Sequence, residues 1–264
     1  MEINFSRWPY STYIYSVKHK IIYAPIAKNG CSSLKYIFYT LLNSSETRSE
    51  PIDVHQYFLT DGAKYTLSTV PPEMAMKMLA DIEYLKFAVI RNPLDRAVSA
   101  YVQKFVTSRI YNALPSIIVK DVVDWVYKNK GQIVDYEKSI NFSQFVDYLT
   151  NTSDCDLESH WAPQYLYLEK VNFDKIFTLE RMTDVYDFLG NRTGCSTPGV
   201  AINVTDIFET SCLSDISELY PSELLNYPSI PSYNNFLPTH IRDSLENKYG
   251  RDFCLYNKLK FRAF

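Results

Sequence analysis

The sequence predicts an α/β fold in which a parallel sheet is flanked by helices. Residues 87–90 form a short continuous apolar run, which is typical of a strand buried on both faces. Residues 21–26 and 174–179 are predicted to be further strands, and a stretch with helical apolar spacing follows each of the three. Strands that alternate with helices in this way indicate a parallel sheet.

The first elements along the chain are a pair of strands and a helix. The strands lie at residues 13–15 and 21–26, with a turn at residues 16–19. A helix is predicted from Ser33 to about Asn43, because apolar side chains recur there on one helical face. These side chains are Leu34, Ile37, Phe38, Leu41 and Leu42.

The later elements repeat this alternation. After the strand at residues 87–90, apolar side chains recur at helical spacing, namely Leu94, Ala97, Val98, Tyr101, Val102 and Phe105. The strand at residues 174–179 is followed by a helix that we expect to end at Gly190. A last helix is predicted near residues 239–249.

A length of 264 residues fits one domain, residues 1–264, better than two. Residues 107–139 carry weaker signals and are a possible helical insertion. Residues 193–238 are rich in Ser, Pro and Asn, and they predict a long loop region before the last helix.

The composition is that of a soluble globular protein, with 46% hydrophobic and 22% charged residues. A net charge of -3 argues against a general nucleic-acid binder, so no nucleic-acid partner is expected. No apolar window approaches the length of a transmembrane helix, and the first twenty residues do not have the pattern of a signal peptide. We therefore expect a cytoplasmic protein, and the sequence leaves its oligomeric state open.

Cysteine usage points the same way. The five cysteines are an odd number, are widely spaced and contain no C-x-x-C pair. This pattern favours reduced thiols over a disulfide framework or a zinc site, so no metal is expected. The cysteines are Cys31, Cys155, Cys195, Cys212 and Cys254.

A candidate anion-binding corner follows the strand at residues 21–26, in the stretch YAPIAKNGCSS. Backbone N–H groups at a helix N-terminus attract anions, and a glycine lets the backbone approach closely. The lysine precedes the glycine here, unlike the order of the common nucleotide-triphosphate loop. The alternative is a simple turn with a serine N-cap. The candidate residues are Lys28, Asn29, Gly30, Cys31, Ser32 and Ser33.

A second candidate corner lies in the stretch FAVIRNPLDRAVSAYVQKF. Arg91 follows a buried strand, Pro93 is suited to the first turn of a helix, and Ser99 lies two turns further on. The carboxyl ends of parallel strands are where α/β sheets bind ligands, and the guanidinium fork suits a phosphate. The alternative is a surface ion pair between Arg91 and Asp95.

Together, the two corners resemble the membrane-associated, Golgi-type carbohydrate sulfotransferases, a group that includes chondroitin sulfotransferases and bacterial relatives. This resemblance implies a P-loop-like fold that uses 3′-phosphoadenosine 5′-phosphosulfate (PAPS) and releases 3′-phosphoadenosine 5′-phosphate (PAP). It assigns residues 28–33 to the 5′-phosphosulfate, and Arg91 and Ser99 to the 3′-phosphate. It also implies a carbohydrate acceptor.

Further matches run in order along the chain, so the resemblance covers most of residues 13–257. They are the stretches VHQYF, HWAPQ, FDKIFTLERM and YGRDFCLYN. Unlike the Golgi enzymes, the chain is not expected to carry an N-terminal anchor, and it lacks the cysteines that commonly follow the His-Trp motif. Both departures fit a soluble version of the family.

Sulfonate transfer needs a positive charge at the leaving oxygen and a base for the acceptor hydroxyl. By analogy with phosphoryl transfer, Lys28 is the candidate for the first role. The resemblance places the catalytic histidine at His55, while a structural or acceptor-positioning role for His55 stays open. His160, beside Trp161, is a candidate for supporting the active site.

Two other functions stay open on the sequence alone. A P-loop kinase would want Gly-Lys-Ser/Thr in that order and an acidic residue at a strand end for Mg²⁺. Here Lys28 precedes Gly30, and Arg91 follows the buried strand. A catalytically inactive PAP-binding module would keep both corners and lose turnover.

Overall fold

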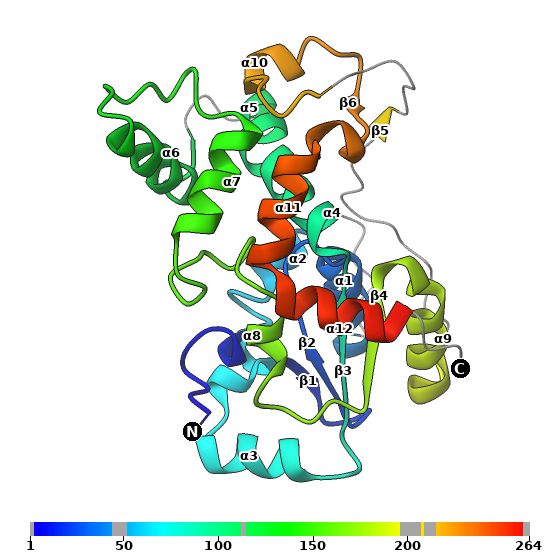
Figure 1. The fold of residues 1–264 in the computed structure, drawn as a ribbon. Helices are drawn as coiled ribbons and strands as arrows, with labels where there is room; N and C mark the ends of the chain where they lie inside the picture. Colours follow the sequence, from blue (N-terminus) through cyan, green and yellow to red (C-terminus); the bar gives the residue numbers. More distant parts are fainter. Residues whose placement is uncertain (1–2, 44–51, 112–114, 196–206, 209–214, 261–264) are drawn as a thin grey trace. The chain divides into compact units, whose positions relative to one another are not determined.

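The computed structural model divides the chain into two compact units (Figure 1). The described residues are 3–43, 52–111, 115–195, 207–208 and 215–260. The first unit comprises residues 1–91, 163–203 and 255–264, and the second comprises residues 92–162 and 204–254. The single domain expected from the chain length stays a prediction.

A four-stranded sheet is the centre of the first unit. Its order is β1 (Ile14–Ser16), β2 (Ile21–Ala24), β3 (Leu85–Ile90) and β4 (Lys175–Thr178). β1 pairs antiparallel with β2, whereas β2–β3 and β3–β4 are parallel. The predicted α/β class with a parallel sheet is therefore confirmed.

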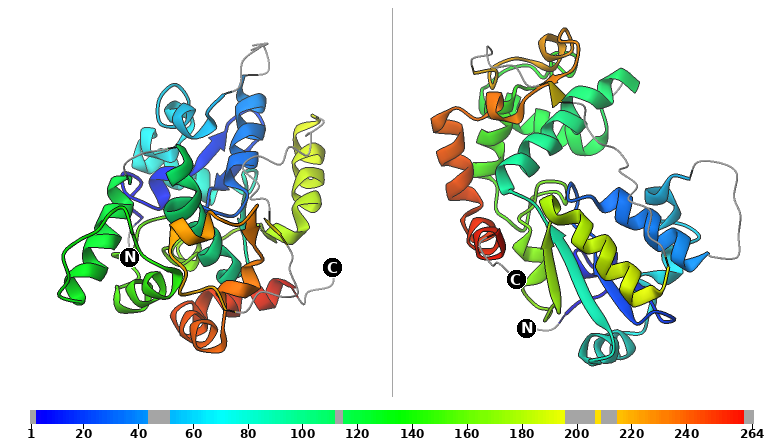
Figure 2. Two further views of the ribbon diagram at one scale, coloured as in Figure 1. Left: turned by 90° about the horizontal axis from the view of Figure 1, so that it is seen from above. Right: turned by 90° about the vertical axis from the view of Figure 1, so that its right-hand side faces the viewer.

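Helices cover one face of this sheet. Tyr23, Phe87 and Val89 point to the face on which α1 (Cys31–Leu42) and α9 (Met182–Thr193) pack. The right-hand view of Figure 2 shows α1 in blue and α9 in yellow-green beside the strands. The rings of Tyr23 and Phe87 stack at 4.9 Å between centroids, which joins neighbouring strands through their side chains.

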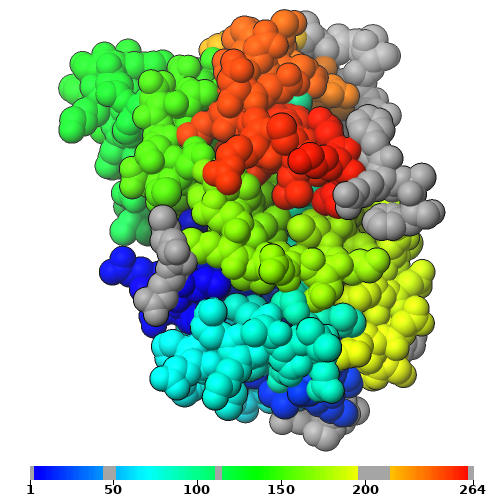
Figure 3. Space-filling view, turned by 60° about the horizontal axis from the view of Figure 1, so that its bottom comes forward, coloured from blue at the N-terminus to red at the C-terminus, as the bar shows by residue number. Residues whose placement is uncertain are grey.

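The opposite face carries the alternate strand residues, including Ile22, Ala88 and Ile90. They pack against the N-terminal segment, α3 (Pro72–Ala80) and α8 (Tyr165–Leu168). In Figure 3, α3 is the cyan segment on the surface. Burial on both faces explains why β2 and residues 87–90 of β3 are apolar throughout rather than alternating.

Most element boundaries fall close to their predicted positions, but the end of α9 does not. The expectation that this helix ends at Gly190 is wrong, because α9 continues to Thr193. Gly194, with φ of 69°, adopts the left-handed conformation that ends helices. A glycine inside a helix costs only about 1 kcal/mol. The last turn of α9, beyond Gly190, is held by Arg192, whose guanidinium group donates to the carbonyls of His19, Lys20 and Glu83.

The second unit is mainly helical. The helix predicted from Leu94 starts as α4 (Pro93–Tyr101), continues as a π-helical segment (Val102–Thr107) and ends as α5 (Ser108–Tyr111). The remaining longer helices include α6 (Ile117–Asn129), α7 (Phe142–Asn151) and α11 (Thr239–Lys248). Helix α12 (Gly250–Lys260), which the sequence analysis did not predict, begins in this unit.

An aromatic cluster forms the core of the second unit. Tyr101 stacks on Phe105 at 5.5 Å, and further ring contacts extend the cluster to Phe142, Phe145, Trp161 and Phe236. Beside it, the buried Arg96 donates to the carbonyls of Ala162 and Ser159. Arg96 therefore fastens the segment that contains the His-Trp motif onto α4.

The two regions with weak sequence signals contain helices and short strands. Residues 107–139 include α5 and α6. Among the described residues of 193–238 are β5 (Ile207–Phe208), α10 (Pro221–Leu224), β6 (Ile230–Pro231) and a 3-10 turn (Tyr233–Phe236).

Candidate functional site

The first candidate corner joins β2 to α1 through a backbone with two left-handed residues. Lys28 has φ of 70° and Gly30 has φ of 71°. The left-handed conformation is ordinary for glycine but unfavourable for lysine. A residue held in such a conformation often marks a functional site, because the surrounding structure has to maintain it.

Gly30 also suits this corner because side chains lie close to it. A Cβ atom at this position would lie 3.0 Å from Leu179 Cδ1 and 3.2 Å from Met182 Cε. Gly30 is also the N-cap of α1 and supplies no side-chain acceptor to the first turn. The first turn therefore offers backbone N–H groups and the positive end of the helix dipole, and it contains the buried Ser32 and Ser33.

The second corner lies beside the first because β2 and β3 are parallel neighbours. Arg91 follows the last residue of β3, and its guanidinium Nη1 donates to the carbonyl oxygen of Lys28 at 3.2 Å. The structure thus brings together two of the predicted cationic residues, Lys28 and Arg91, at the carboxyl edge of the sheet. This edge is the usual ligand site of parallel α/β sheets.

The buried amide of Gln164 connects these two corners. Its Oε1 accepts from the Arg91 backbone N–H at 2.9 Å, and its Nε2 donates to the Arg91 carbonyl at 2.9 Å. The same Oε1 accepts from Asn29 Nδ2 at 2.6 Å. Gln164, which ends the HWAPQ stretch, therefore fixes the spacing between the loop and the end of β3.

Asn29 is wholly buried, and its Nδ2 also donates to the carbonyl of Val89 at 2.9 Å. Both hydrogens of its amide group are thus used inside the protein. We assign the Asn29 side chain to holding the loop against β3, whereas its predicted contact with a cofactor stays a prediction.

His55 lies next to the first corner. It belongs to the short helix α2 (Val54–Tyr57), whose N-cap Asp53 accepts hydrogen bonds from the backbone N–H groups of His55 and Gln56. Its Nε2 is 2.8 Å from Ser32 Oγ, and its Nδ1 is 3.4 Å from Lys35 Nζ. The structure therefore joins the candidate base to the candidate phosphosulfate loop.

Lys35 determines which ring nitrogen of His55 carries the proton. A charged ammonium can only donate, so Nδ1 must accept and the imidazole proton must be on Nε2. Nε2 then donates to Ser32 Oγ. Burial lowers the pKa of the Lys35 ammonium, and the nearby Cys31 and Asp53 partly offset this effect.

Two predicted site residues belong to the second unit. Ser99 is buried on α4, and its predicted contact with a 3′-phosphate stays a prediction.

His160, the other of these residues, is paired with a carboxylate. Its Nδ1 lies 2.7 Å from Glu158 Oε2. Burial raises the pKa of Glu158, but the hydrogen bonds and charge of His160, with a bond from Ser159, lower it overall to about 2. In its own unit, His160 therefore has a charge partner, while its predicted support of the active site stays a prediction.

Gln164, Lys35 and Asp53 are not among the site residues predicted from the sequence. Asp53 had a recognisable signal, since aspartate is a preferred N-cap. Lys35 follows Ser32 at a spacing of three on one helix, which also places the two side chains on one face. The role of Gln164 depends on contacts with residues 73 and 135 positions away, which no local pattern reports.

Within the described parts of the chain, no group of three or more His, Cys, Asp or Glu side chains is placed to hold a metal ion. No described helix has the length and apolar character needed to cross a membrane.

Comparison with known proteins identifies a family. The model of the sulfotransferase family matches residues 11–258, which is more than half of the chain. No solved structure matches the chain with comparable significance.

Curated relatives include carbohydrate sulfotransferases at low identity. Carbohydrate sulfotransferase 14 of Danio rerio is 26% identical over 67% of this chain and 47% of its own length. Carbohydrate sulfotransferase 11 of Danio rerio is 24% identical over 81% of this chain and 66% of its own length. Carbohydrate sulfotransferase 14 of Homo sapiens is 25% identical over 63% of this chain and 42% of its own length. The chain thus spans from under half to about two thirds of the relatives it matches.

The amide of Gln164 is testable by a change of one atom. Gln164→Glu places a carboxylate where an N–H group meets the Arg91 carbonyl, so we expect a loss of about 3 kcal/mol in the free energy of unfolding at pH 7. Chemical denaturation measures this loss. Acidic pH should recover part of it, because a protonated carboxyl can donate. The control is Gln132→Glu, at an exposed position, and equal effects of the two substitutions would contradict the role of Gln164.

The tautomer of His55 provides a second test. Two-bond ¹H–¹⁵N correlation spectra of the protein should show the proton on Nε2 of His55. Lys35→Met should weaken this preference, because the donor to Nδ1 is lost. Lys128→Met, at an exposed position on α6, should leave the His55 signals unchanged. A proton on Nδ1 in the wild-type protein would disprove the assignment.

Proposed function

This chain belongs to the sulfotransferase family, and we propose that it transfers a sulfonate group from PAPS to a hydroxyl of a carbohydrate acceptor. One observation carries the proposal above all others. The Lys28 loop and Arg91 lie at the carboxyl ends of adjacent parallel strands, and Gln164 holds them together. Such a corner suits a nucleotide with separate anionic groups.

The residues at the corner fit the proposed donor. PAPS carries anionic groups on both its 5′ and 3′ oxygens, and the corner offers a helix N-terminus with Lys28 on one strand and Arg91 on the next. Gly30 keeps the start of α1 free of a side chain, and a Cβ atom there would press against Leu179 and Met182. β3 is followed by Arg91 rather than by the acidic residue that a Mg²⁺-dependent kinase would use.

The chain's own groups would position the reactants and stabilise charge. When bound, PAPS supplies the sulfonate and a phosphate as the leaving group. Lys28 would stabilise the negative charge that develops on the leaving oxygen. In enzymes, removing one group with this role typically costs about 3 kcal/mol of transition-state stabilisation. Arg91 would bind a phosphate through its guanidinium, and the first turn of α1 would bind the other anionic group.

His55 is the proposed base for the acceptor hydroxyl. With the proton on Nε2, the lone pair on Nδ1 faces Lys35. For Nε2 to hold the lone pair, Lys35 must give a proton to Nδ1 and Nε2 must release its own proton to solvent. This leaves a neutral Lys35 and a neutral imidazole with its proton on Nδ1, and the lowered pKa of Lys35 reduces the cost of the change. Nε2 could then accept a proton from an acceptor hydroxyl that replaces Ser32 as its partner.

The acceptor is proposed to be a neutral or weakly charged carbohydrate. The curated relatives are named carbohydrate sulfotransferases, which supports the chemical class. A polyanionic glycosaminoglycan binds through many Lys and Arg contacts. The net charge of -3 and the absence of a dense basic run in the sequence favour an acceptor of lower charge.

The choice of nucleotide separates the sulfotransferase from a kinase. PAP should stabilise the protein by about 2.7 kcal/mol at a concentration 100 times its Kd, whereas ATP with Mg²⁺ should do so far less. Arg91→Ala should weaken PAP binding about tenfold or more, because a charged contact to phosphate is lost. Thermal unfolding and calorimetry measure both effects. Equal stabilisation by ATP and PAP would rule out the sulfotransferase proposal.

Turnover separates an enzyme from an inactive PAP-binding module. Lys28→Ala should lower kcat by about 10²-fold to 10³-fold, because positive charge at the leaving oxygen is lost. His55→Ala should lower kcat about 10²-fold or more and leave PAP affinity nearly unchanged. His240→Ala, at an exposed position on α11, is the control.

The assay uses labelled PAPS with a panel of saccharide acceptors. Near-normal turnover of His55→Ala together with loss of turnover in His160→Ala would show that the base is misassigned. No turnover by the wild-type protein with any acceptor, together with tight PAP binding, would favour the inactive module.

A further inference from the structure

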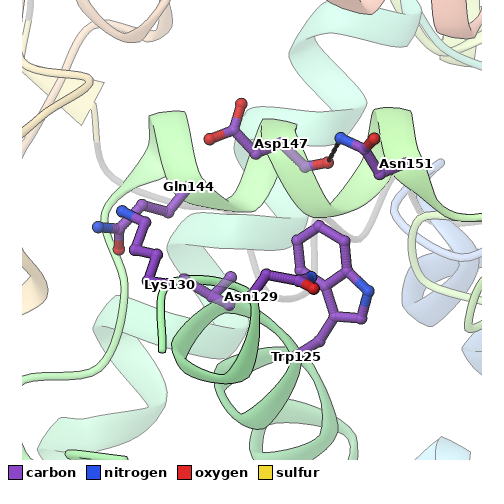
Figure 4. Close-up of a pocket in the computed structure, with 7 residues that line it drawn as sticks. Trp125, Asn129, Lys130, Gln144, Asp147 and Asn151 are labelled. Atoms are coloured by element: carbon purple, nitrogen blue, oxygen red, sulfur yellow. Dashed lines mark hydrogen bonds between the residues drawn. The ribbon is translucent and has the colours of Figure 1, made fainter. Parts of the chain in front are cut away.

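A cleft of about 340 Å³ lies between α6 and α7 in the second unit. Its volume lies at the lower end of the range for small-molecule sites. Figure 4 shows the indole of Trp125 reaching from α6 toward α7, with Lys130 and Gln144 at the opposite end of the cleft. Asn129, Asp147 and Asn151 complete its polar lining.

The aromatic wall of the cleft is held in place by its surroundings. Trp125 is half-buried, and its ring meets the ring of Tyr148 edge-on at 5.4 Å between centroids. A half-buried indole that is fixed by such a contact offers a rigid apolar surface to a ligand at little cost in conformational entropy.

Two amide groups of the lining are also oriented by hydrogen bonds. Gln144 forms a capping box with Asn141 at the start of α7, and its Nε2 donates to the hydroxyl of Tyr220. Asn151 Nδ2 donates to the backbone carbonyl of Asp147 at 2.8 Å, as Figure 4 shows. The side-chain oxygen of Asn151 is then the atom suited to accept a hydrogen bond from a ligand hydroxyl.

The charges of the lining select the class of ligand. Lys130 and Asp147 are of opposite sign, so the cleft has no net formal charge. A sulfated or phosphorylated ligand would be repelled by the carboxylate of Asp147 and would have one lysine to bind it. A neutral ligand with many hydroxyl groups can use the amides, the carboxylate and the ammonium together as hydrogen-bond partners.

From these features we propose that the cleft between α6 and α7 binds a neutral hexose unit of an oligosaccharide, with one sugar face against Trp125. The ring face of a hexose is largely C–H, which suits an indole, and its edge carries the hydroxyls that the amide groups bind. Binding of a saccharide in the cleft does not depend on the proposed function. The identification of that saccharide as the acceptor of sulfonate transfer rests on it.

A neighbouring cleft extends the surface available to a longer chain. It measures about 220 Å³ and shares Lys130 and Gln144 with the first cleft. Its lining includes Tyr220, whose ring lies 4.4 Å from the ammonium of Lys138. Two adjoining clefts that meet at Lys130 fit two or more consecutive sugar units better than a monosaccharide.

Calorimetric titration without any nucleotide tests this proposal. The probes are maltotetraose, cellotetraose and chitotetraose, which are neutral, and a chondroitin sulfate tetrasaccharide, which is not. At least one neutral probe should bind, and Trp125→Ala should weaken its binding about tenfold. Asn151→Ala, at an exposed position, should also weaken binding and tests the cleft if loss of Trp125 unfolds the protein.

The matched control is Lys128→Ala, which changes an exposed residue of α6 outside the lining. Binding of no neutral probe, or equal binding by Asn151→Ala and Lys128→Ala, would overturn the proposal, as would a stronger affinity for the sulfated probe. Because the titration contains no PAPS, absence of sulfonate transfer would refute the proposed function and leave the binding result standing.

Discussion

The amide of Gln164 is the interaction on which the candidate site depends. It pairs with both polar groups of the Arg91 backbone and accepts from Asn29, so one buried side chain joins two strand ends. An amide can do this because it carries a donor and an acceptor side by side. Leaving any of these buried groups unpaired would cost about 1–3 kcal/mol, and so the two corners keep a fixed spacing.

The arrangement around His55 depends on the same corner. Helix α1 begins at the loop, and its residues Ser32 and Lys35 face the two ring nitrogens of His55. Residues three apart lie on one side of a helix, so the start of α1 determines where both partners stand. The helix that is proposed to bind the anionic donor therefore also orients the proposed base, and a shift of its first turn would change both.

Local patterns in the sequence predict the sheet and both corners. Each strand is marked by a contiguous apolar run, and the Lys, Gly and Arg residues of the corners directly follow two of these runs. They do not predict Gln164, whose partners are distant in sequence, or the π-helical turn at residues 102–107, whose apolar spacing resembles that of an α-helix. Gly190 shows the opposite error, since a local helix-ending signal is overridden by packing. The misses thus fall where tertiary contacts, rather than propensity, decide the structure.

The backbone of Lys28 links this constraint to the proposed chemistry. A left-handed conformation costs a non-glycine residue about 1–2 kcal/mol, and a glycine here would avoid the cost. A lysine at this position is explained if its ammonium is needed there. Arg91 donates to the Lys28 carbonyl, and Asn29, the next residue, is held by Gln164 and Val89. The hydrogen bonds that connect the strand ends therefore also maintain the unfavourable backbone conformation of Lys28, whose ammonium is the proposed catalytic charge.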